Sequence, residues 1–543
     1  MKYAVPTAAQ QLWQDHEILM FIHFLAETYR AADEPRGTVV PVDRICPTHL
    51  DTDQWVDVAL AMGAKMIVMV AKHVEGFCWW QTETSPYGVK ELAWRNSKGD
   101  LVAELAATCQ RRGVRLGIYL QAGDDVHKAG ISGTCATPEA QSCYNAVYRQ
   151  QLTELLSRYG EIGEIWFDGS VIIDVGDILK RYAPEAMIFQ GPHATIRWVG
   201  NENGFAPYPA WNSVRAEIAR TGMATAANGS PQGDTWLPLE VDTGMSTAGE
   251  NGSSSWCWRP NPARHVLKRM DRLMETYYRS VGHGATLLLN NTPDPTGLIP
   301  EADARRCTEF GAEIDRRFGQ SLGTSAGQGE CIELVLPKIT SVDHVVTMEV
   351  IAFGERIRRY VIEGAGRDRA WRVLAEGTAI GHKKIDFFKP ARVRVIRLRV
   401  LESSGLPLVR RLAAFNVGST PAFKHETEIY VANSLGRVGK WLVEDGGAWQ
   451  TVEWDIASHV TDARQYLAEF IPDKPDIRAD LEIQSVCLLL NGIEVGAQFV
   501  TPTDHPHQFN LNITAAQSPY GLRAVMRCKC PGKIRGEFII HRQ

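Results

Sequence analysis

An aspartate at the end of an apolar strand is the first candidate for chemistry in this chain. In GEIGEIWFDGS, residues 160–170, the apolar side chains within 162–167 predict a buried strand, and Asp168 follows it directly. A carboxylate beside apolar surface loses hydration, so it must either gain partners or carry a function. Taken alone, Asp168 is also consistent with a residue that caps the next segment. A second acid nearby would favour the functional interpretation.

Two glutamates are candidates for this second acid. Cleavage of a glycosidic bond needs one carboxyl group to attack or assist the anomeric carbon and another to protonate the departing oxygen. Glu202 in RWVGNENG and Glu240 in WLPLEVD are each flanked by Trp and turn residues. Burial against Trp is one way in which a Glu keeps its proton near neutral pH. Residue chemistry therefore indicates paired acids around a neutral pocket and leaves both glutamates open.

The stretch AKHVEGFCWW, residues 71–80, places polar side chains beside aromatic ones. Lys72, His73 and Glu75 lead into a turn, and three aromatic residues follow. Sugar hydroxyls need directional hydrogen bonds and the C–H faces of sugars need apolar stacking, so this mixture is typical of a sugar pocket. A capped strand end with core aromatics explains the same residues equally well. His23 in MFIHF is likewise consistent with a core histidine.

The elements that must position these residues alternate along the first 320 residues. Apolar runs that predict fully buried strands lie at 20–24, 64–71, 114–120, 164–169 and 187–190. Amphipathic helix candidates lie between them, so the series predicts a parallel sheet, and its length suits a (β/α)8-like barrel. The polar candidates follow strand ends, where such a barrel assembles its site. They are His23, His73, Tyr119 and Asp168.

The remainder of the chain has a different sequence pattern. After about residue 325, strand-like segments follow one another with few helices between them. We expect a barrel domain over residues 1–325, a first β-sandwich over 326–419 and a second β-sandwich over 420–543. The predicted fold class is therefore α/β for the catalytic part, followed by one or two all-β domains.

Composition excludes several classes of protein. The chain has 543 residues, of which 44% are apolar and 22% charged, with a formal net charge of -5. This profile is typical of a globular protein and gives no electrostatic case for a nucleic-acid partner. No signal-peptide core or membrane-spanning stretch is evident, so the expected location is cytoplasmic, or periplasmic or secreted if the chain is a processed form. Oligomeric state stays open.

Cysteine usage gives no support for a metal site. The eleven cysteines are scattered without the spacing of zinc ligands, which indicates reduced and mostly buried thiols. His23, His73 and Asp168 could be drawn as a ligand set, but no HxH or HExxH spacing supports it. We therefore expect neither a metal nor another cofactor.

Several motifs, in order, resemble the α-L-fucosidases of glycoside hydrolase family 29. They are FIHF, AKHVEGFCWW, LGIYL, QLTELLSRYGEIGEIWFDG, IRWVGNENG and YYRSVGHGATLLLNNTPDPTGLIPEAD, which cover most of residues 13–315. GERIRRYVIEG, AWRVLAEGTAIGHKKIDFF and RVRVIRLRV resemble the discoidin-like β-sandwich that often follows that catalytic domain. The resemblance implies a retaining exo-glycosidase on a distorted barrel, acting on fucosylated or related oligosaccharides without a metal.

The resemblance also implies roles for individual residues. Asp168 matches the nucleophile, and Glu202 matches the acid/base of the subfamily whose sequences carry RWVGNE, with Glu240 as the reserve choice. The residues implied to bind the sugar or line its pocket are His23, His73, Trp80, Tyr119, Arg197 and Trp258.

Some positions depart from the family pattern. The usual HHDGF is His73-Val74-Glu75-Gly76-Phe77 here, so Val74 replaces one sugar-binding histidine. Leu25 stands where a glycine is common, Gln121 where a serine is common, and residues 34–37 replace an EWG-like segment. Loss of a hydrogen-bond donor can change specificity by orders of magnitude. A different deoxy or substituted hexose, or a fucoside in an unusual linkage, therefore remains open as the substrate.

Three alternatives from other classes remain. The first is an inverting hydrolase that uses the same acids. Its two carboxyl groups would lie about 6.5 to 9.5 Å apart, whereas those of a retaining enzyme would lie about 5 to 5.5 Å apart. A non-catalytic carbohydrate-binding protein is an alternative if the changes at Val74 and Leu25 mark a decayed site. A metal-dependent hydrolase is the third. For the C-terminal sandwiches, a purely supporting role and carbohydrate binding are both open.

Overall fold

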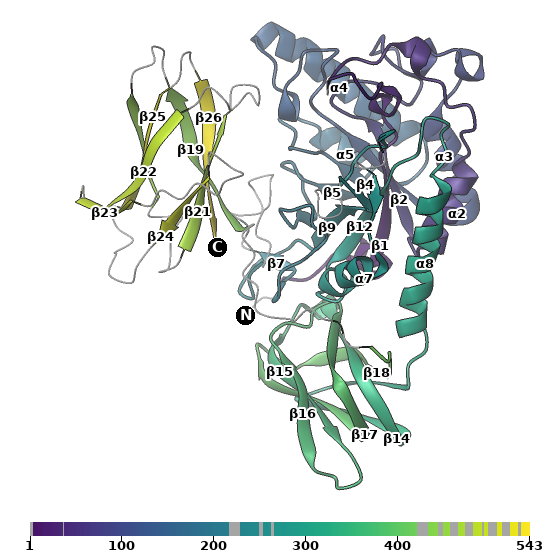
Figure 1. Cartoon of the computed structure of the whole chain (residues 1–543), viewed down its shortest axis with the longest axis vertical. Coiled ribbons are helices and arrows are strands. Elements are labelled where there is room, and N and C mark those ends of the chain that lie inside the picture. The colour runs from purple at the N-terminus through teal and green to yellow at the C-terminus, as the bar shows by residue number, and fades with distance from the viewer. Residues whose placement is uncertain are drawn as a thin grey trace. The chain divides into compact units, whose positions relative to one another are not determined.

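The computed structural model divides the chain into two compact units (Figure 1), Met1–Ala224 with Gly229–Glu426, and Thr225–Asn228 with Thr427–Gln543. In the first unit it describes residues 4–35, 37–214, 216, 229–248, 254–261, 265–419 and 421. In the second it describes 433–443, 449–456, 465–472, 482–490, 493–497, 508–512, 522–529 and 534–542.

Eight parallel strands form a nearly closed barrel in the first unit. In ring order they are β1 (Ile18–Ile22), β2 (Met66–Lys72), β3 (Arg115–Leu120), β4 (Ile162–Trp166), β5 (Met187–Phe189), β6 (Arg197–Trp198), β9 (Leu239–Gly244) and β12 (Thr286–Asn291). Strand β12 pairs with β1, and a parallel bridge between Phe189 and Ile196 joins β5 to the start of β6. The predicted (β/α)8-like barrel is therefore confirmed.

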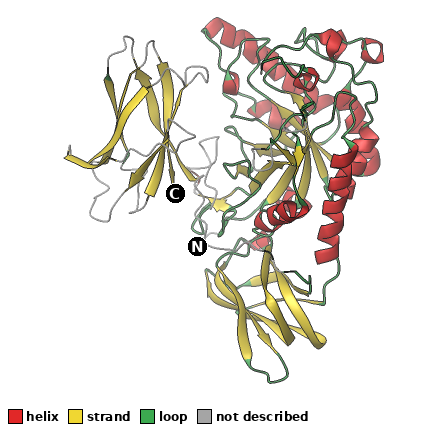
Figure 2. Ribbon diagram, in the orientation of Figure 1, coloured by secondary structure: helices red, strands yellow, loops and turns green. Residues whose placement is uncertain are grey.

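Helices follow most of the barrel strands and lie outside them (Figure 2). They are α2 (Thr52–Ala61), α3 (Leu101–Arg112), α4 (Pro138–Arg158), α5 (Gly176–Tyr182), α7 (Met270–Arg279) and α8 (Glu301–Phe318). Their starts follow ordinary capping chemistry, because the side chains of Asp51, Asp100 and Thr137 accept hydrogen bonds from first-turn N–H groups. Residues 190–196, between β5 and β6, contain no helix, which makes the barrel irregular on this side.

Short elements complete the first unit. The described two-residue strands outside the barrel are β7 (Ser213–Val214), β8 (Thr235–Trp236), β10 (Ser246–Thr247) and β11 (Val266–Leu267). The described 3-10 turns are η1 (Ala26–Tyr29), η2 (Val42–Arg44), η3 (Val89–Glu91), η4 (Trp94–Ser97) and η5 (Ile131–Gly133), with η7 (Ile351–Phe353) between two strands that follow the barrel. Helix α1 (Ala8–His16) precedes β1, and its Trp13 packs into the barrel core. The indole N–H of Trp13 donates to Glu164 at 2.6 Å, so α1 covers the N-terminal end of the barrel.

A six-stranded antiparallel sheet follows the barrel in the same unit. In sheet order its strands are β13 (Gly323–Gln328), β18 (Leu408–Phe415), β14 (Cys331–Glu349), β17 (Lys384–Ser403), β15 (Ile357–Ala365) and β16 (Trp371–Gly377). These strands enclose their own apolar core. Buried polar contacts join the sheet to the barrel: the Asn212 side chain donates to Glu355 at 2.7 Å, and Tyr278 Oη lies 2.8 Å from His344 Nε2.

The second unit contains two antiparallel four-stranded sheets. One is β19 (Asn433–Val443), β26 (Ile534–Arg542), β21 (Gln465–Pro472) and β24 (Gln508–Asn512), and the other is β20 (Gln450–Asp455), β25 (Leu522–Lys529), β22 (Glu482–Leu490) and β23 (Ile493–Ala497). Trp454 of one sheet contacts Phe470 and Phe538 of the other, as in a sandwich core.

The predicted domain boundaries remain predictions. Strand β13 begins at Gly323, close to the expected boundary at residue 325, whereas residue 420 lies outside the described residues. Among the helices that the structure describes, none combines the length and the apolar composition needed to cross a bilayer.

Candidate active site

Alternation along the strands carries polar side chains to the C-terminal end of the barrel. Successive residues of a strand face opposite sides, so every second residue points into the barrel. On β4 and its extension, inward-facing Trp166 is followed two residues later by Asp168, and on β9 Glu240 is followed by Asp242. The middle of the barrel is filled by aromatic and aliphatic groups, including Phe21. A polar layer therefore lies above a packed apolar one.

Asp168 lies half-buried within this polar layer and has defined neighbours. Tyr119 Oη donates to Asp168 Oδ2 at 3.1 Å, and Gln121 Nε2 lies 3.4 Å from the same hydroxyl. The ring of His73 stacks on Tyr119 with 5.6 Å between ring centroids. Gly169 has φ +70, and a Cβ there would lie 2.7 Å from Ile131, so the residue after Asp168 favours glycine.

The two predicted histidines continue the layer away from Asp168. The rings of His23 and His73 lie 6.2 Å apart, and His23 Nδ1 is 2.8 Å from Asn290 Oδ1. The ring of His23 also contacts the ring of Trp256, with 5.2 Å between the ring centroids. The indole N–H of Trp256 donates to Glu202 Oε2 at 2.8 Å. A continuous series of contacts thus connects Asp168 to Glu202 through Tyr119, the two histidines and Trp256.

The two histidines differ in charge state. Burial, together with the neighbouring His73, lowers the pKa of His23 to about 3, so its ring is neutral. Burial alone would lower the pKa of His73 as well, but its bond to Glu75 and the negative charges of Glu75, Asp168 and Glu27 raise it. His73 Nδ1 lies 3.3 Å from Glu75 Oε2. The site therefore contains one neutral hydrogen-bonding ring and one ring that favours the cation.

A network of side-chain hydrogen bonds fixes the backbone of Glu202. Its carbonyl oxygen accepts hydrogen bonds from Thr243 Oγ1 at 2.9 Å and from Ser254 Oγ at 3.0 Å. Lys268 Nζ donates to Thr243 Oγ1 at 2.5 Å, and burial lowers the pKa of this lysine to about 7. The carboxyl group of Glu202 is exposed, whereas its main chain is held by side chains from β9 and the segment after it. An exposed carboxyl group on a fixed main chain is suited to hydrogen-bond an oxygen atom of a bound ligand.

Asp242 is a third carboxyl group close to these two. Its side chain is 4% exposed, and its Oδ1 accepts a hydrogen bond from the Trp198 indole at 2.7 Å. Burial raises the pKa of Asp242 to about 8, and the negative charges of Glu202 and Asp168 add to this increase. Asp242 therefore holds its proton at neutral pH and can act as a hydrogen-bond donor.

Glu240, the reserve choice for the acid/base, lies deeper in the barrel. It is fully buried, and Trp166 Nε1 donates to Glu240 Oε1 and to Glu164 Oε1, both at 2.9 Å. Burial and the neighbouring Glu164 raise the pKa of Glu240 well above its usual range. A neutral carboxyl group in this position supports the barrel core and lies below the polar layer.

Three residues predicted to line the pocket are used elsewhere. The Trp80 indole donates to Glu154 of α4 at 2.9 Å, away from the polar layer. The guanidinium of Arg197 is buried and donates to the carbonyl groups of Leu237 and Trp211, because on β6 it is Trp198 that faces inward. In WCW, Trp258 is half-buried, whereas the contacts with the site are made by Trp256.

Sequence reasoning missed residues that hold or shape the site. Asp242 follows Glu240 by the spacing of a strand, which could have indicated that both face the barrel interior. Glu27 of η1 binds Arg259 and lies close enough to raise the pKa of His73, but no local motif marks it. Among residues 34–37, Glu34 pairs with Arg44 at 2.7 Å, and Arg36 lies outside the described residues.

The departures from the family pattern have visible consequences. Glu75 engages His73, so the position that follows Val74 supplies a charge partner to the remaining histidine. Gln121 contacts Tyr119, the partner of Asp168. Within the part of the chain that the structure describes, no group of three or more His, Cys, Asp or Glu side chains could hold a metal ion.

Comparison with known proteins gives one consistent result. A family profile described as Alpha-L-fucosidase matches residues 41–316. Alpha-L-fucosidase 1 of Arabidopsis thaliana is 29% identical over 483 residues, which are 79% of this chain and 91% of that protein.

Solved structures agree with these sequence matches. A Bacteroides thetaiotaomicron protein assigned as an α-L-fucosidase has 32% identity and a TM-score of 0.71, and covers 76% of this chain and 100% of its own. A Ruminococcus gnavus GH29 fucosidase in complex with fucose has 25% identity and a TM-score of 0.67, with 76% and 95% of the two chains covered.

Proposed function

We propose that this chain, which belongs to the α-L-fucosidase family (glycoside hydrolase family 29), cleaves α-L-fucosides by double displacement with Asp168 as nucleophile and Glu202 as acid/base. The observation that carries this assignment is the series of contacts from Asp168 through Tyr119, the histidines and Trp256 to Glu202. It gives two carboxyl groups in unlike surroundings along one polar layer.

In the first step, Asp168 attacks the anomeric carbon while protonated Glu202 donates its proton to the leaving oxygen. The bond from the anomeric carbon to that oxygen breaks, and a glycosyl ester forms on Asp168. In the second step, Glu202 takes a proton from water, whose oxygen displaces the aspartate and returns the starting configuration. The Tyr119 hydroxyl donates to Asp168 in the resting state and fixes its orientation.

The two histidines beside the nucleophile would hydrogen-bond the sugar. Burial lowers the pKa of His23 to about 3, whereas the bond to Glu75 outweighs burial and raises the pKa of His73. The Ruminococcus gnavus relative was solved with fucose, which supports fucose as the sugar bound here. The alternative with a specific observation behind it is a related deoxy or substituted hexose, because Val74 and Glu75 alter the histidine motif.

For residues 326–419 we propose a discoidin-like sandwich that supports the barrel. The described strands of this segment are antiparallel and enclose an apolar core, which is consistent with that fold. Its buried contacts with the barrel, such as Glu355 with Asn212, favour a supporting role.

The test is hydrolysis of an aryl α-L-fucoside by Asp168→Asn and Glu202→Ala. We expect Asp168→Asn to lose about three orders of magnitude or more in kcat with an unchanged fold. Glu202→Ala should lose more activity on poor leaving groups than on activated aryl ones, and added azide should restore part of the loss. NMR of the first product anomer should show retention. Near-normal turnover by Asp168→Asn, or inversion, would remove this mechanism.

A further inference from the structure

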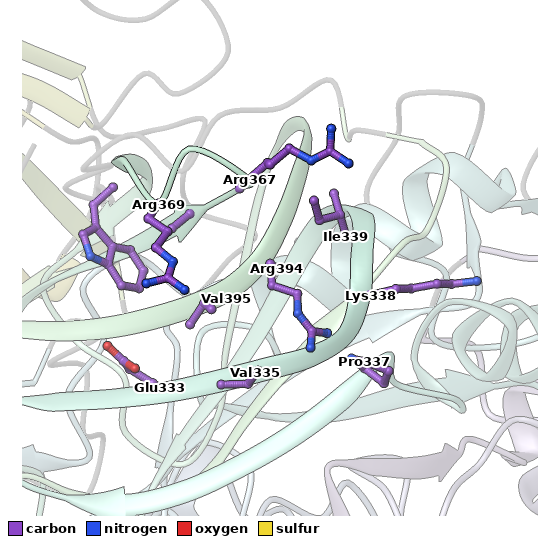
Figure 3. A pocket seen from close by; sticks show the side chains of 12 residues that line it. Glu333, Val335, Pro337, Lys338, Ile339, Arg367, Arg369, Arg394 and Val395 are labelled. Atoms are coloured by element: carbon purple, nitrogen blue, oxygen red, sulfur yellow. The ribbon is translucent and has the colours of Figure 1, made fainter.

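A pocket of about 600 Å³ opens on the six-stranded sheet, outside the barrel. Its lining comes from β14, from β17 and from the hairpin between β15 and β16 (Figure 3). The lining residues that matter below are Glu333, Val335, Arg369, Trp371, Arg394 and Val395. None of them belongs to the polar layer of the proposed active site.

Local strand irregularity creates this pocket. Along residues 331–337 of β14, buried and exposed residues alternate, so Leu334 enters the sheet core while Val335 is 60% exposed on the other face. The pairing of β14 with β17 shifts register between Val335 and Thr340, opposite Arg394. Such a bulge separates the strands locally and redirects side chains. Arg394 lies on β17 opposite this irregularity, and its side chain lines the pocket.

The pocket carries an excess of positive charge. The described residues supply no ion-pair partner for Arg367, Arg369 or Arg394, and Glu333 is the acidic residue of the lining. Nη1 of Arg394 is enclosed and has no hydrogen-bond acceptor among them. An enclosed N–H without an acceptor is costly, so the Arg394 guanidinium is incompletely hydrogen-bonded in this conformation. Lys338 also lines the pocket, but Figure 3 shows its side chain extending away from Arg394.

One wall of the pocket is a fixed aromatic ring. Trp371 is 37% exposed, and the guanidinium of Arg397 lies 3.8 Å from its ring centroid. Arg397 is in turn held by Glu363, at 2.7 Å. An oriented indole next to guanidinium groups matches a ligand with an apolar sugar face and an anionic substituent.

We propose that this pocket binds an acidic glycan, with Arg394 and Arg369 on its sulfate or carboxylate group and Trp371 against the sugar ring. The guanidinium fork suits a planar or tetrahedral oxyanion, because two parallel N–H groups meet two oxygens. Val335 and Val395 form an apolar floor below the ring. The site lies on a separate sheet, so it does not depend on the catalytic assignments.

Calorimetric titration of the full chain tests this proposal. The probes are a sulfated galactan tetrasaccharide, the same tetrasaccharide after desulfation, a galacturonate tetramer and inorganic sulfate. The variants are Arg394→Met, Trp371→Ala and Arg369→Asn, the last because Asn tolerates the φ of +53 at this position. Arg305→Met, at an exposed position of α8, is the matched control for loss of one charge.

We expect the sulfated tetrasaccharide or the galacturonate tetramer to bind, and the desulfated one to bind at least about tenfold more weakly. Each pocket variant should weaken binding of the acidic glycan by about tenfold or more, while Arg305→Met leaves it unchanged. Thermal unfolding identifies any variant that fails to fold, and Arg369→Asn lies on an exposed hairpin where folding is least affected.

Four results would overturn the proposal. The first is that the wild-type chain binds neither acidic glycan, the second is that it binds the desulfated tetrasaccharide equally well, and the third is that folded Arg369→Asn and Arg394→Met keep the wild-type affinity. Equal affinity for inorganic sulfate and the sulfated tetrasaccharide would mean an adventitious ion only, and would also overturn it.

Discussion

At the scale of single residues, the carboxyl groups of the barrel differ because their surroundings differ. Asp168 is half-buried and accepts a hydrogen bond from Tyr119, whereas Glu202 is exposed and contacts Trp256. Asp242 and Glu240 are buried and hold protons. Like charges in a confined site cannot all ionise, so only some of these groups are available as carboxylates near neutral pH.

Asp242 should influence the alkaline limb of the activity profile. Its raised pKa of about 8 keeps it neutral below that pH, and as pH rises through 8 it becomes a negative charge beside Asp168 and the proton donor Glu202. Proton donation by Glu202 creates negative charge, so ionised Asp242 should slow it. Asp242→Asn stays neutral, and its kcat/KM relative to wild type should therefore rise above about pH 8. Identical alkaline limbs in the two enzymes would contradict this role.

Thr243 should matter through the position of Glu202. Thr243→Val removes the donor to the Glu202 carbonyl and the acceptor for Lys268. We expect kcat to fall about tenfold to a hundredfold on a fucoside with a poor leaving group, and less on an activated aryl fucoside, because misplacement harms proton donation most. Thr243→Ser should restore most of the activity. Equal losses on both substrates would instead indicate a general structural effect.

At the scale of elements, β4 and β9 form a support below the site. Their carboxyl groups, Glu164 and Glu240, meet at the indole of Trp166, and α1 adds the Trp13 donor from below. Two buried carboxyl groups side by side are tolerated only if at least one holds a proton. Strands β4 and β9, which lead to Asp168 and Asp242, are thus joined in the core by Glu164 and Glu240, of which at least one is protonated.

Replacement of Glu240 by Gln should show whether this residue stabilises the barrel core or takes part in catalysis. Glu240 has a raised pKa in the folded chain, so its contribution to stability is present at low pH and is lost as pH rises above the unfolded value of about 4.5. The free energy of unfolding of Glu240→Gln should fall less steeply with pH than that of the wild type, so near pH 8 the variant should be the more stable of the two.

Urea unfolding at about pH 5 and pH 8 measures this difference, and aryl fucoside hydrolysis by the same variant serves as the catalytic control. The variant should keep most of its activity. Strong loss of activity that azide restores would move the acid/base role from Glu202 to Glu240.

At the scale of the whole molecule, the proposed catalytic groups all lie in the first unit. The described contacts that join Asp168 to Glu202 come from residues 23–256, and the six-stranded sheet is attached to the barrel through buried polar pairs. The Bacteroides thetaiotaomicron relative matches 76% of this chain along its entire length. The solved chain of that relative therefore has no counterpart to the remaining 24% of this chain.

A chain that ends at residue 426 should retain activity. Because the proposed site lies within the first unit, we expect kcat on an aryl α-L-fucoside to stay within about twofold of the full chain. Circular dichroism and activity of the shortened chain, measured beside the full chain, provide the check. A folded but inactive product would mean that residues 427–543 contribute to the reaction.

The sequence by itself determined the barrel, the position of Asp168 and the series of strand-end residues. This was possible because buried parallel strands are continuous apolar runs, and because residues that follow them meet at one end of a barrel. His23, His73, Tyr119 and Asp168 do lie in one layer. Such regularities depend on local order along the chain, which a sequence records directly.

Only the tertiary structure decided which loop side chains reach that layer. Trp256 and Trp258 are chemically identical and two residues apart, and Arg197 and Trp198 are adjacent, so no local property distinguishes the member that faces the site. The protonation of Asp242 and Glu240 likewise depends on burial and on charges that lie far away in the chain. Long-range packing fixes orientation and dielectric surroundings, and these set the chemistry of a carboxyl group.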